Sequence, residues 1–113
     1  AVWKYYGYYI APANAATNTQ WNGSITNNSY CSGKKGASWR IPSKDECRTI
    51  LGGSDNAAES VWREYLNKGV FSNEYYTDAG NGNAYIMLRY MAGAMEIAPK
   101  EKSYKGVVRC ITR

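Results

Sequence analysis

The chain between residues 31 and 46 reads CSGKKGASWRIPSKDE. Its last four residues, Ser43 to Glu46, have the spacing of a capping box, in which the serine and glutamate side chains each bond a backbone N–H of the other residue. Pro42 precedes the box, and Gly52 and Gly53 close the segment that follows it, as residues outside a short helix often do. The stretch therefore predicts a helix that begins with this box.

The apolar residues of this predicted helix lie on one face. Cys47, Ile50 and Leu51 follow the i, i+3, i+4 spacing that brings side chains together on a helix surface. Such a face normally packs inward against a core. We therefore expect Cys47 to be a buried, small apolar residue.

A second helix is predicted a few residues further on. Asn56, with Glu59 three residues later, has the character of a helix start, and the run from Asn67 to Gly69 has that of a helix end. Between these signals the apolar residues share one side: Ala58, Val61, Trp62, Tyr65 and Leu66. The pattern predicts an amphipathic helix.

The residues before the first helix divide into two kinds of sequence. Val2 to Ile10 is aromatic and β-branched and is followed by Pro12, which predicts one strand near a sheet edge. Residues 13–38 hold Asn, Thr, Ser and Gly with few apolar anchors, which predicts a long loop with one short helix.

The residues after the second helix return to strand chemistry. The segments separating the strands are residues 78–83 and 99–105. Helices grouped in the first half, followed by several strands, favour an α+β fold with an antiparallel sheet over a parallel doubly wound sheet. We expect residues 1–113 to form one domain. The predicted strands are Val70–Phe71, Tyr75–Thr77, Ala84–Met91 and Val107–Ile111.

Composition narrows the function classes. The chain has 113 residues, 44% of them hydrophobic and 20% charged, which suits one small core. It lacks histidine, so the usual general base at neutral pH and the commonest metal ligand are missing. The net charge of +5 favours acidic partners. The basic residues are scattered and form no stripe of the kind that binds nucleic acid, so we expect no nucleic-acid partner. No apolar run approaches the roughly 18 residues of a membrane helix, so we expect no membrane insertion.

The abundant residue types are those of binding surfaces. The chain has 11 Tyr, 10 Asn, 11 Gly, 9 Ser and 4 Trp, against one Phe. Tyr and Trp give large rigid contact areas, and Asn, Ser and Gly give adaptable hydrogen bonding. For any single tyrosine, an equally good interpretation is that it replaces Phe on a half-buried strand.

The three cysteines match no zinc-ligand spacing and contain no Cys-x-x-Cys pair. In an oxidising compartment, one bridge and one free thiol is the natural division. Loop-closure entropy does not choose the partner of Cys110. A bridge to Cys31 would stabilise the fold by about 4.5 kcal/mol and a bridge to Cys47 by about 4.3 kcal/mol, which is nearly the same. Burial favours Cys31–Cys110, because Cys47 suits a helix face and a free Cys31 would lie in a polar stretch. In a reducing compartment all three would be thiols.

Several motifs together resemble a known family. Residues 31–46 resemble the Cys, glycine-rich spacer and Trp-Arg-Leu-Pro-Thr-x-x-Glu signature of the major paralogous domain of many secreted bacterial proteins. Residues 75–78 are similar to that family's Tyr-Trp-Ser-Ser, residues 84–85 to its Ala-Trp or Ala-Tyr, and residues 108–111 to its closing Val-Arg-Cys-Val. The motifs span residues 31–113 in the family's order, which is more specific than any one of them.

The family has the C-type lectin-like fold. The resemblance implies a twisted antiparallel sheet flanked by two helices, with long loops, first and last strands side by side, and a ligand surface on the long-loop side. It also implies a Cys31–Cys110 bridge, with Cys47 in the place of a core leucine. The segment Trp21–Tyr30 departs from the family, because it contains Asn-Gly and Asn-Asn where a helix is usual.

The chain lacks the motifs of the fold's calcium-dependent and enzymatic members. It has neither the Glu-Pro-Asn loop nor the Trp-Asn-Asp strand of calcium-dependent lectins. Asp78, Asn81 and Asn83 include one carboxylate, so an Asn/Gly turn is the better interpretation, and we expect no metal and no cofactor. The context of the reactive cysteine pair of formylglycine-generating enzymes is also missing, so we expect no enzyme.

These observations predict a non-enzymatic module that binds a glycan or a protein outside a bacterial cell or on a phage particle. Tyr85 and Arg89 share one face of the predicted strand, so a sugar ring would stack on the tyrosine while the arginine binds a carboxylate or sulfate. The candidate ligand-binding residues are Asn73, Tyr75, Asp78, Asn81, Asn83, Tyr85, Arg89 and Tyr90.

Two alternatives stay open at this level. The asparagines and tyrosines of residues 73–90 resemble those of ligand-binding proteins that retroelements diversify at adenine-containing codons. The other alternative is a structural tip or cap domain of a pilus or surface fibre. A mature or excised start at Ala1 suits this structural alternative as well as the binding module.

Overall fold

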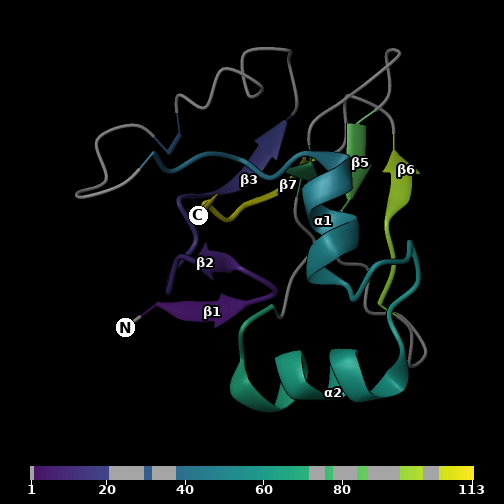
Figure 1. Cartoon of the computed structure of the whole chain (residues 1–113). Coiled ribbons are helices and arrows are strands. Elements are labelled where there is room, and N and C mark those ends of the chain that lie inside the picture. Colours follow the sequence, from purple (N-terminus) through teal and green to yellow (C-terminus); the bar gives the residue numbers. More distant parts are fainter. Residues whose placement is uncertain are drawn as a thin grey trace.

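The computed structural model describes residues 2–20, 30–31, 38–71, 76–77, 84–86, 95–100 and 105–113. Within these ranges the chain forms two helices and three antiparallel sheets, so it is an α+β fold as the element order predicts (Figure 1). The helices are α1 (Lys44–Ile50) and α2 (Glu59–Lys68). The sheets contain β1 (Trp3–Tyr5), β2 (Tyr8–Ile10) and β8 (Ile111–Thr112); β3 (Ala16–Gln20) and β7 (Lys105–Val108); and β4 (Tyr76–Thr77), β5 (Ala84–Ile86) and β6 (Ala98–Lys100).

Helix α1 begins as predicted. Ser43 is its N-cap, and both hydrogen bonds of the capping box to Glu46 are present. The predicted apolar face of Cys47, Ile50 and Leu51 is fully buried. Gly52 and Gly53 follow the helix with φ of +94° and +100°, a conformation that residues with a Cβ rarely adopt.

Helix α2 starts later than predicted. Its N-cap is Ala58, and the predicted start at Asn56 is wrong because Asn56 forms a β-bridge with Glu96. Ala58 is exposed instead of lying on the buried face. Tyr65 is buried, and Val61, Trp62 and Leu66 pack against the core as expected. Gly69 ends the helix with φ of +68°, as the predicted stop requires.

The single N-terminal strand predicted for Val2 to Ile10 is wrong. The segment is a hairpin, β1–β2, in which Tyr5 pairs with Tyr8. The two turn residues, Tyr6 and Gly7, have φ of 51° and 84°, as a type I′ turn requires. Glycine at the second turn position breaks a run that reads as continuous strand by composition alone.

The predicted long loop of residues 13–38 contains a strand. β3 pairs with β7 from Ala16↔Val108 to Gln20↔Lys105, with an irregularity between Ala16 and Thr19. Sequence composition misses β3 because its residues are mostly small or polar, and pairing with β7 supplies its hydrogen bonds. The part of 13–38 that the structure describes contains no helix, and residues 21–29 and 32–37 lie outside it.

Two of the C-terminal strand predictions differ from the structure. The strand predicted for Val70–Phe71 is wrong, because these two residues are fully buried but lie outside any strand. The predicted strand Val107–Ile111 is divided into β7 and β8, because Arg109 and Cys110 lie between two different sheets.

The third sheet confirms two predicted strands in part. β4 covers Tyr76 and Thr77, and β5 covers residues 84–86, whereas Tyr75 and residues 87–91 lie outside the described residues. The separating segment predicted for residues 99–105 is partly wrong, because β6 includes Pro99 and Lys100. Pro99 pairs with Tyr85 at the outer strand of the order β4-β5-β6, where a proline is tolerated.

Two buried clusters form the core. The larger joins α1 and α2 to the β1–β2–β8 sheet, with Ile10, Ile50, Tyr65 and Phe71 among its members. The smaller surrounds the disulfide between Cys31 and Cys110. Among the described residues, neither helix is long and apolar enough to cross a membrane.

Candidate functional site

The predicted ligand-binding residues all belong to the second half of the chain. Tyr85 is in β5, and the structure describes its backbone. The other seven predicted positions lie outside the described residues: Asn73, Tyr75, Asp78, Asn81, Asn83, Arg89 and Tyr90.

The backbone fixes both ends of the segment that carries three of these residues. Residues 78–83 connect β4 to β5, which pair antiparallel with Tyr76 opposite Ile86 and Thr77 opposite Tyr85. β5 pairs in turn with β6, in which Ala98 is buried and Pro99 exposed. The segment is therefore attached to a hydrogen-bonded sheet, the arrangement by which scaffolds present binding loops.

A disulfide joins the middle of the chain to its C-terminal end. Cys31 and Cys110 are bridged with their Cα atoms 5.8 Å apart, which is the predicted pairing. Beside it, the Arg40 N–H donates to the Ile111 carbonyl at 2.9 Å, and the Ile111 N–H donates to the Arg40 carbonyl at 2.8 Å. The motif that precedes α1 is thus held against the last strand.

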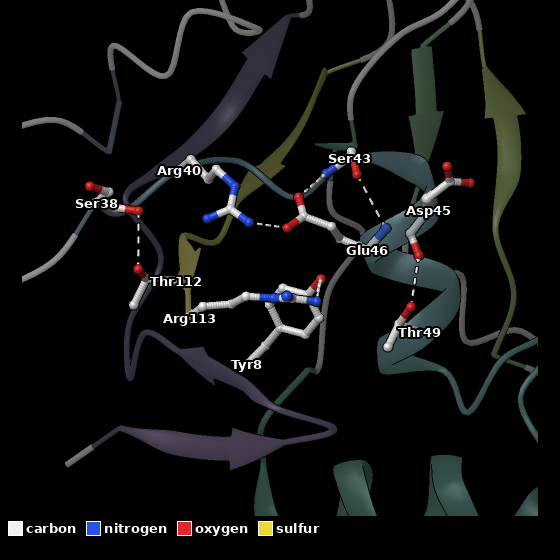
Figure 2. A network of polar contacts seen from close by, with 9 residues as sticks. All are labelled: Tyr8, Ser38, Arg40, Ser43, Asp45, Glu46, Thr49, Thr112 and Arg113. Carbon is white, nitrogen blue, oxygen red and sulfur yellow. Dashed lines mark hydrogen bonds and ion pairs between the residues drawn. The ribbon is translucent and has the colours of Figure 1, made fainter.

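A polar network explains the residue types of this motif. One Glu46 carboxylate oxygen accepts from the Ser43 N–H at 3.0 Å, and the other pairs with the Arg40 guanidinium (Figure 2). The Glu46 N–H donates to Ser43 Oγ at 3.2 Å. The Glu46 side chain is only 15% exposed, so its charge is compensated by partners from its own motif. The motif connects α1 to β8, which is a structural role.

Two further contacts fix the C-terminus, also drawn in Figure 2. The Thr112 hydroxyl donates to the Ser38 carbonyl at 3.1 Å. The Arg113 guanidinium donates to the Tyr8 hydroxyl at 2.9 Å and lies 4.7 Å from the centre of the Tyr8 ring. These contacts attach the last residues to β2 and to the segment before Arg40.

Arg109 has a structural role that the sequence analysis missed. It is 6% exposed, and its Nη1 donates to the carbonyls of Ala11 at 3.0 Å and Val70 at 2.9 Å. Its Nε donates to Asn14 Oδ1 at 3.0 Å. The residue thereby fixes Val70, three residues before Asn73, the first of the predicted binding residues. Sequence position alone gives no sign that an arginine is buried here.

Cys47 is the free cysteine among the described residues, and its surroundings make it unreactive. It is fully buried on α1. Burial raises the pKa of its thiol well above the ordinary value, and the nearby Glu46 carboxylate raises it further. Because the thiolate is the nucleophilic form, Cys47 is a packing residue.

The described residues contain no group of three or more His, Cys, Asp or Glu side chains placed to hold a metal ion. Asp78, Asn81 and Asn83 lie outside them. No protein-family model, curated protein or solved structure matches the chain.

Proposed function

We propose that the chain is a non-enzymatic ligand-binding module on a C-type lectin-like scaffold. It works outside a bacterial cell or on a phage particle and recognises a glycan or a protein without calcium. The observation that carries the proposal is the pairing of Thr77 with Tyr85, which brings together the two strands that the Asp- and Asn-containing segment 78–83 connects.

The topology supports the finer description of the fold. The N-terminal hairpin is joined to the last strand through the pairs Tyr9↔Thr112 and Ile10↔Ile111. The bridge between Cys31 and Cys110 connects the first and the last of the four motifs on which the family resemblance depends. Helices α1 and α2 lie beside the β1–β2–β8 sheet (Figure 1), and side chains of both helices and of this sheet form one core.

The disulfide supports an oxidising compartment. Such bonds persist in secreted proteins and on cell or virion surfaces, where small domains rely on them for stability. The remaining thiol of Cys47 is buried, so an oxidising environment leaves no exposed thiol among the described residues. Both cysteine states suit a module that operates outside the cytoplasm.

The side-chain chemistry supports recognition. Amide groups such as those of Asn81 and Asn83 both donate and accept hydrogen bonds, which matches sugar hydroxyls and peptide groups. A tyrosine at position 85 offers a flat ring for stacking, and Arg89 offers a fork of donors for a carboxylate or sulfate. The net charge of +5 adds an attraction for acidic ligands.

A glycan array probed with the disulfide-intact chain, with a pull-down from surface extracts in parallel, tests the proposal. We expect binding that persists in EDTA and is lost in the Asn81→Ala/Asn83→Ala/Tyr85→Ala variant. The matched control is Asn67→Ala/Tyr30→Ala, which removes an exposed asparagine and an exposed tyrosine elsewhere. Retention of a sister subunit alone would favour the structural-fibre alternative, and loss of binding in EDTA would contradict the calcium-independent proposal.

A further inference from the structure

The turn of the N-terminal hairpin holds an unusual residue. Tyr6 has φ of 51°, and it is the one non-glycine residue with positive φ in the part of the chain that the structure describes. Type I′ turns favour Asn, Asp or Gly at this position, because a larger side chain is strained there. Tyr6 is also 51% exposed, so burial in the core does not account for it.

The Tyr6 side chain forms a wall of a pocket of about 340 Å³ between the hairpin and α2. A Cβ added at Gly52 would lie 3.5 Å from both the Tyr6 hydroxyl and Val61 Cγ2, so this hydroxyl reaches the loop that follows α1. Figure 1 shows the hairpin turn on the side of the molecule where α1 and α2 lie. The pocket is lined by Lys4, Tyr5, Tyr6, Ser60, Val61, Glu64 and Tyr65.

The aromatic base of the pocket is held in place by contacts within the protein. Tyr65 is buried and its hydroxyl donates to the Ile50 carbonyl at 2.5 Å. The Tyr5 ring meets the Tyr65 ring edge to face, with centres 4.7 Å apart, and its hydroxyl donates to Glu64 at 3.0 Å. These rings are therefore positioned before any ligand arrives, which lowers the entropy lost on binding.

The polar groups of the lining have both signs. Glu64 supplies acceptors, the Ser60 hydroxyl both donates and accepts, and the Lys4 ammonium, which lies 5.1 Å from the centre of the Tyr9 ring, supplies donors. The Glu64 carboxylate would repel a free anion. Lys4 and Lys68, whose Nζ lies 3.3 Å from Glu64, would repel a free cation. A neutral molecule that carries adjacent hydroxyls on one side and a C–H face for an aromatic ring satisfies all of these groups.

We propose that this pocket is a sugar-binding subsite that takes one neutral pyranose ring, with the C–H face of the sugar on Tyr6 and its hydroxyls on Lys4, Ser60 and Glu64. The pocket volume lies at the lower end for small-molecule sites, which suits a single sugar unit. None of its residues belongs to the 73–90 segment, so the subsite holds or fails independently of the proposed function of that segment.

The test is a ¹⁵N-resolved NMR titration of the disulfide-intact chain with methyl glycosides of glucose, galactose, mannose and N-acetylglucosamine. We expect saturable shifts at Tyr6, Ser60 and Glu64 for at least one glycoside, with a dissociation constant of about 1–10 mM. Tyr6→Ala should weaken binding at least about tenfold. Tyr6→Asn should weaken it equally while raising the melting temperature, because asparagine adopts positive φ more easily. Tyr30→Ala, a change of another exposed tyrosine, should leave the affinity unchanged.

Three results would overturn the subsite. The first is the absence of saturable shifts in the pocket up to roughly 50 mM of every glycoside. The second is unchanged affinity in the Tyr6→Asn variant, since the turn is then intact and only the ring is gone. The third is saturable binding of choline at Tyr6 and Glu64 without any sugar binding, which would assign the pocket to an ammonium group.

Discussion

Arg40 and Ile111 exchange two backbone hydrogen bonds, of 2.9 Å and 2.8 Å, next to the disulfide that ends at Cys110. The Arg40 side chain pairs at the same time with Glu46 at the start of α1. One residue therefore connects the last strand, the disulfide region and the first helix. The predicted recognition surface depends on this scaffold, and so do the following expectations about stability.

The cysteine states should be measurable directly. Mass spectrometry of the native chain should give one free thiol, at Cys47, which is alkylated only after unfolding because it is fully buried. Bridged peptides should join Cys31 to Cys110. A bridge that includes Cys47, or rapid alkylation of Cys47 in the native state, would contradict the arrangement of α1.

Removal of the bridge should destabilise the fold strongly. The Cys31→Ser/Cys110→Ser variant should lose about 3–5 kcal/mol of unfolding free energy, because the bridge closes a loop with a sequence separation of 79 residues. Urea unfolding followed by circular dichroism measures the loss. Cys47→Ala is the control that removes the other cysteine, and it should cost less, since it deletes one small buried group. An equal loss of unfolding free energy in both variants would contradict the stabilising role of the bridge.

The Arg40–Glu46 pair should contribute more than an exposed ion pair. Glu46→Gln should cost about 1–2 kcal/mol, because it weakens the capping box and leaves a half-buried guanidinium without its carboxylate. The comparison is Glu59→Gln, which breaks the exposed pair of Glu59 with Arg63 and should cost about 0.5 kcal/mol or less. A double-mutant cycle between Arg40→Met and Glu46→Gln measures the coupling, and a coupling near zero would reject the structural role of the motif.

Arg109→Met should destabilise the protein by about 2–4 kcal/mol. The substitution leaves the carbonyls of Ala11 and Val70 without this donor in a buried position. Arg113→Met is the matched control, because Arg113 is exposed and stacks on Tyr8 at the chain end. Thermal unfolding of both variants checks the difference, and equal melting temperatures would show that Arg109 is not the anchor described above.

Alkaline pH should unfold the protein through Tyr65. Burial raises the pKa of the Tyr65 phenol far above its ordinary value of 10.0, with smaller contributions from Tyr6 and Tyr5. The folded state therefore favours the neutral phenol, so its stabilising effect is complete below pH 10 and is lost as the pH rises above that value. Unfolding free energies measured at increasing pH should fall above 10, and the fall should be shallower in Tyr65→Phe. An equally steep fall in that variant would contradict this assignment.

The elements with local signals could be predicted from the sequence. The start of α1 depends on Ser43 and Glu46, and the end of α2 on Gly69, so contacts within a few residues determine both. The hairpin turn was missed because tyrosine at its first position is not a type I′ signal. β3 was missed because its strand character comes from a partner about 90 residues away, β7.

For the candidate site, too, the sequence predicts the features with local signals and misses those that depend on distant segments. The 31–110 bridge could be predicted because burial of Cys47 follows from the helical spacing of α1. The role of Arg109 could not, since the carbonyls that hold it come from segments 39 and 98 residues away along the chain. The pocket at Tyr6 was missed for a similar reason, because it needs the hairpin and α2 side by side.

A calorimetric titration of a ligand selected on the glycan array or in the pull-down tests the recognition proposal most directly. Our account predicts saturable binding by the intact chain, with the same affinity in calcium and in EDTA. It also predicts an affinity loss of at least about tenfold in Asn81→Ala/Asn83→Ala/Tyr85→Ala and none in Asn67→Ala/Tyr30→Ala. Equal affinities in the two variants, or turnover of the ligand during the titration, would contradict a non-enzymatic module that binds through the 73–90 segment.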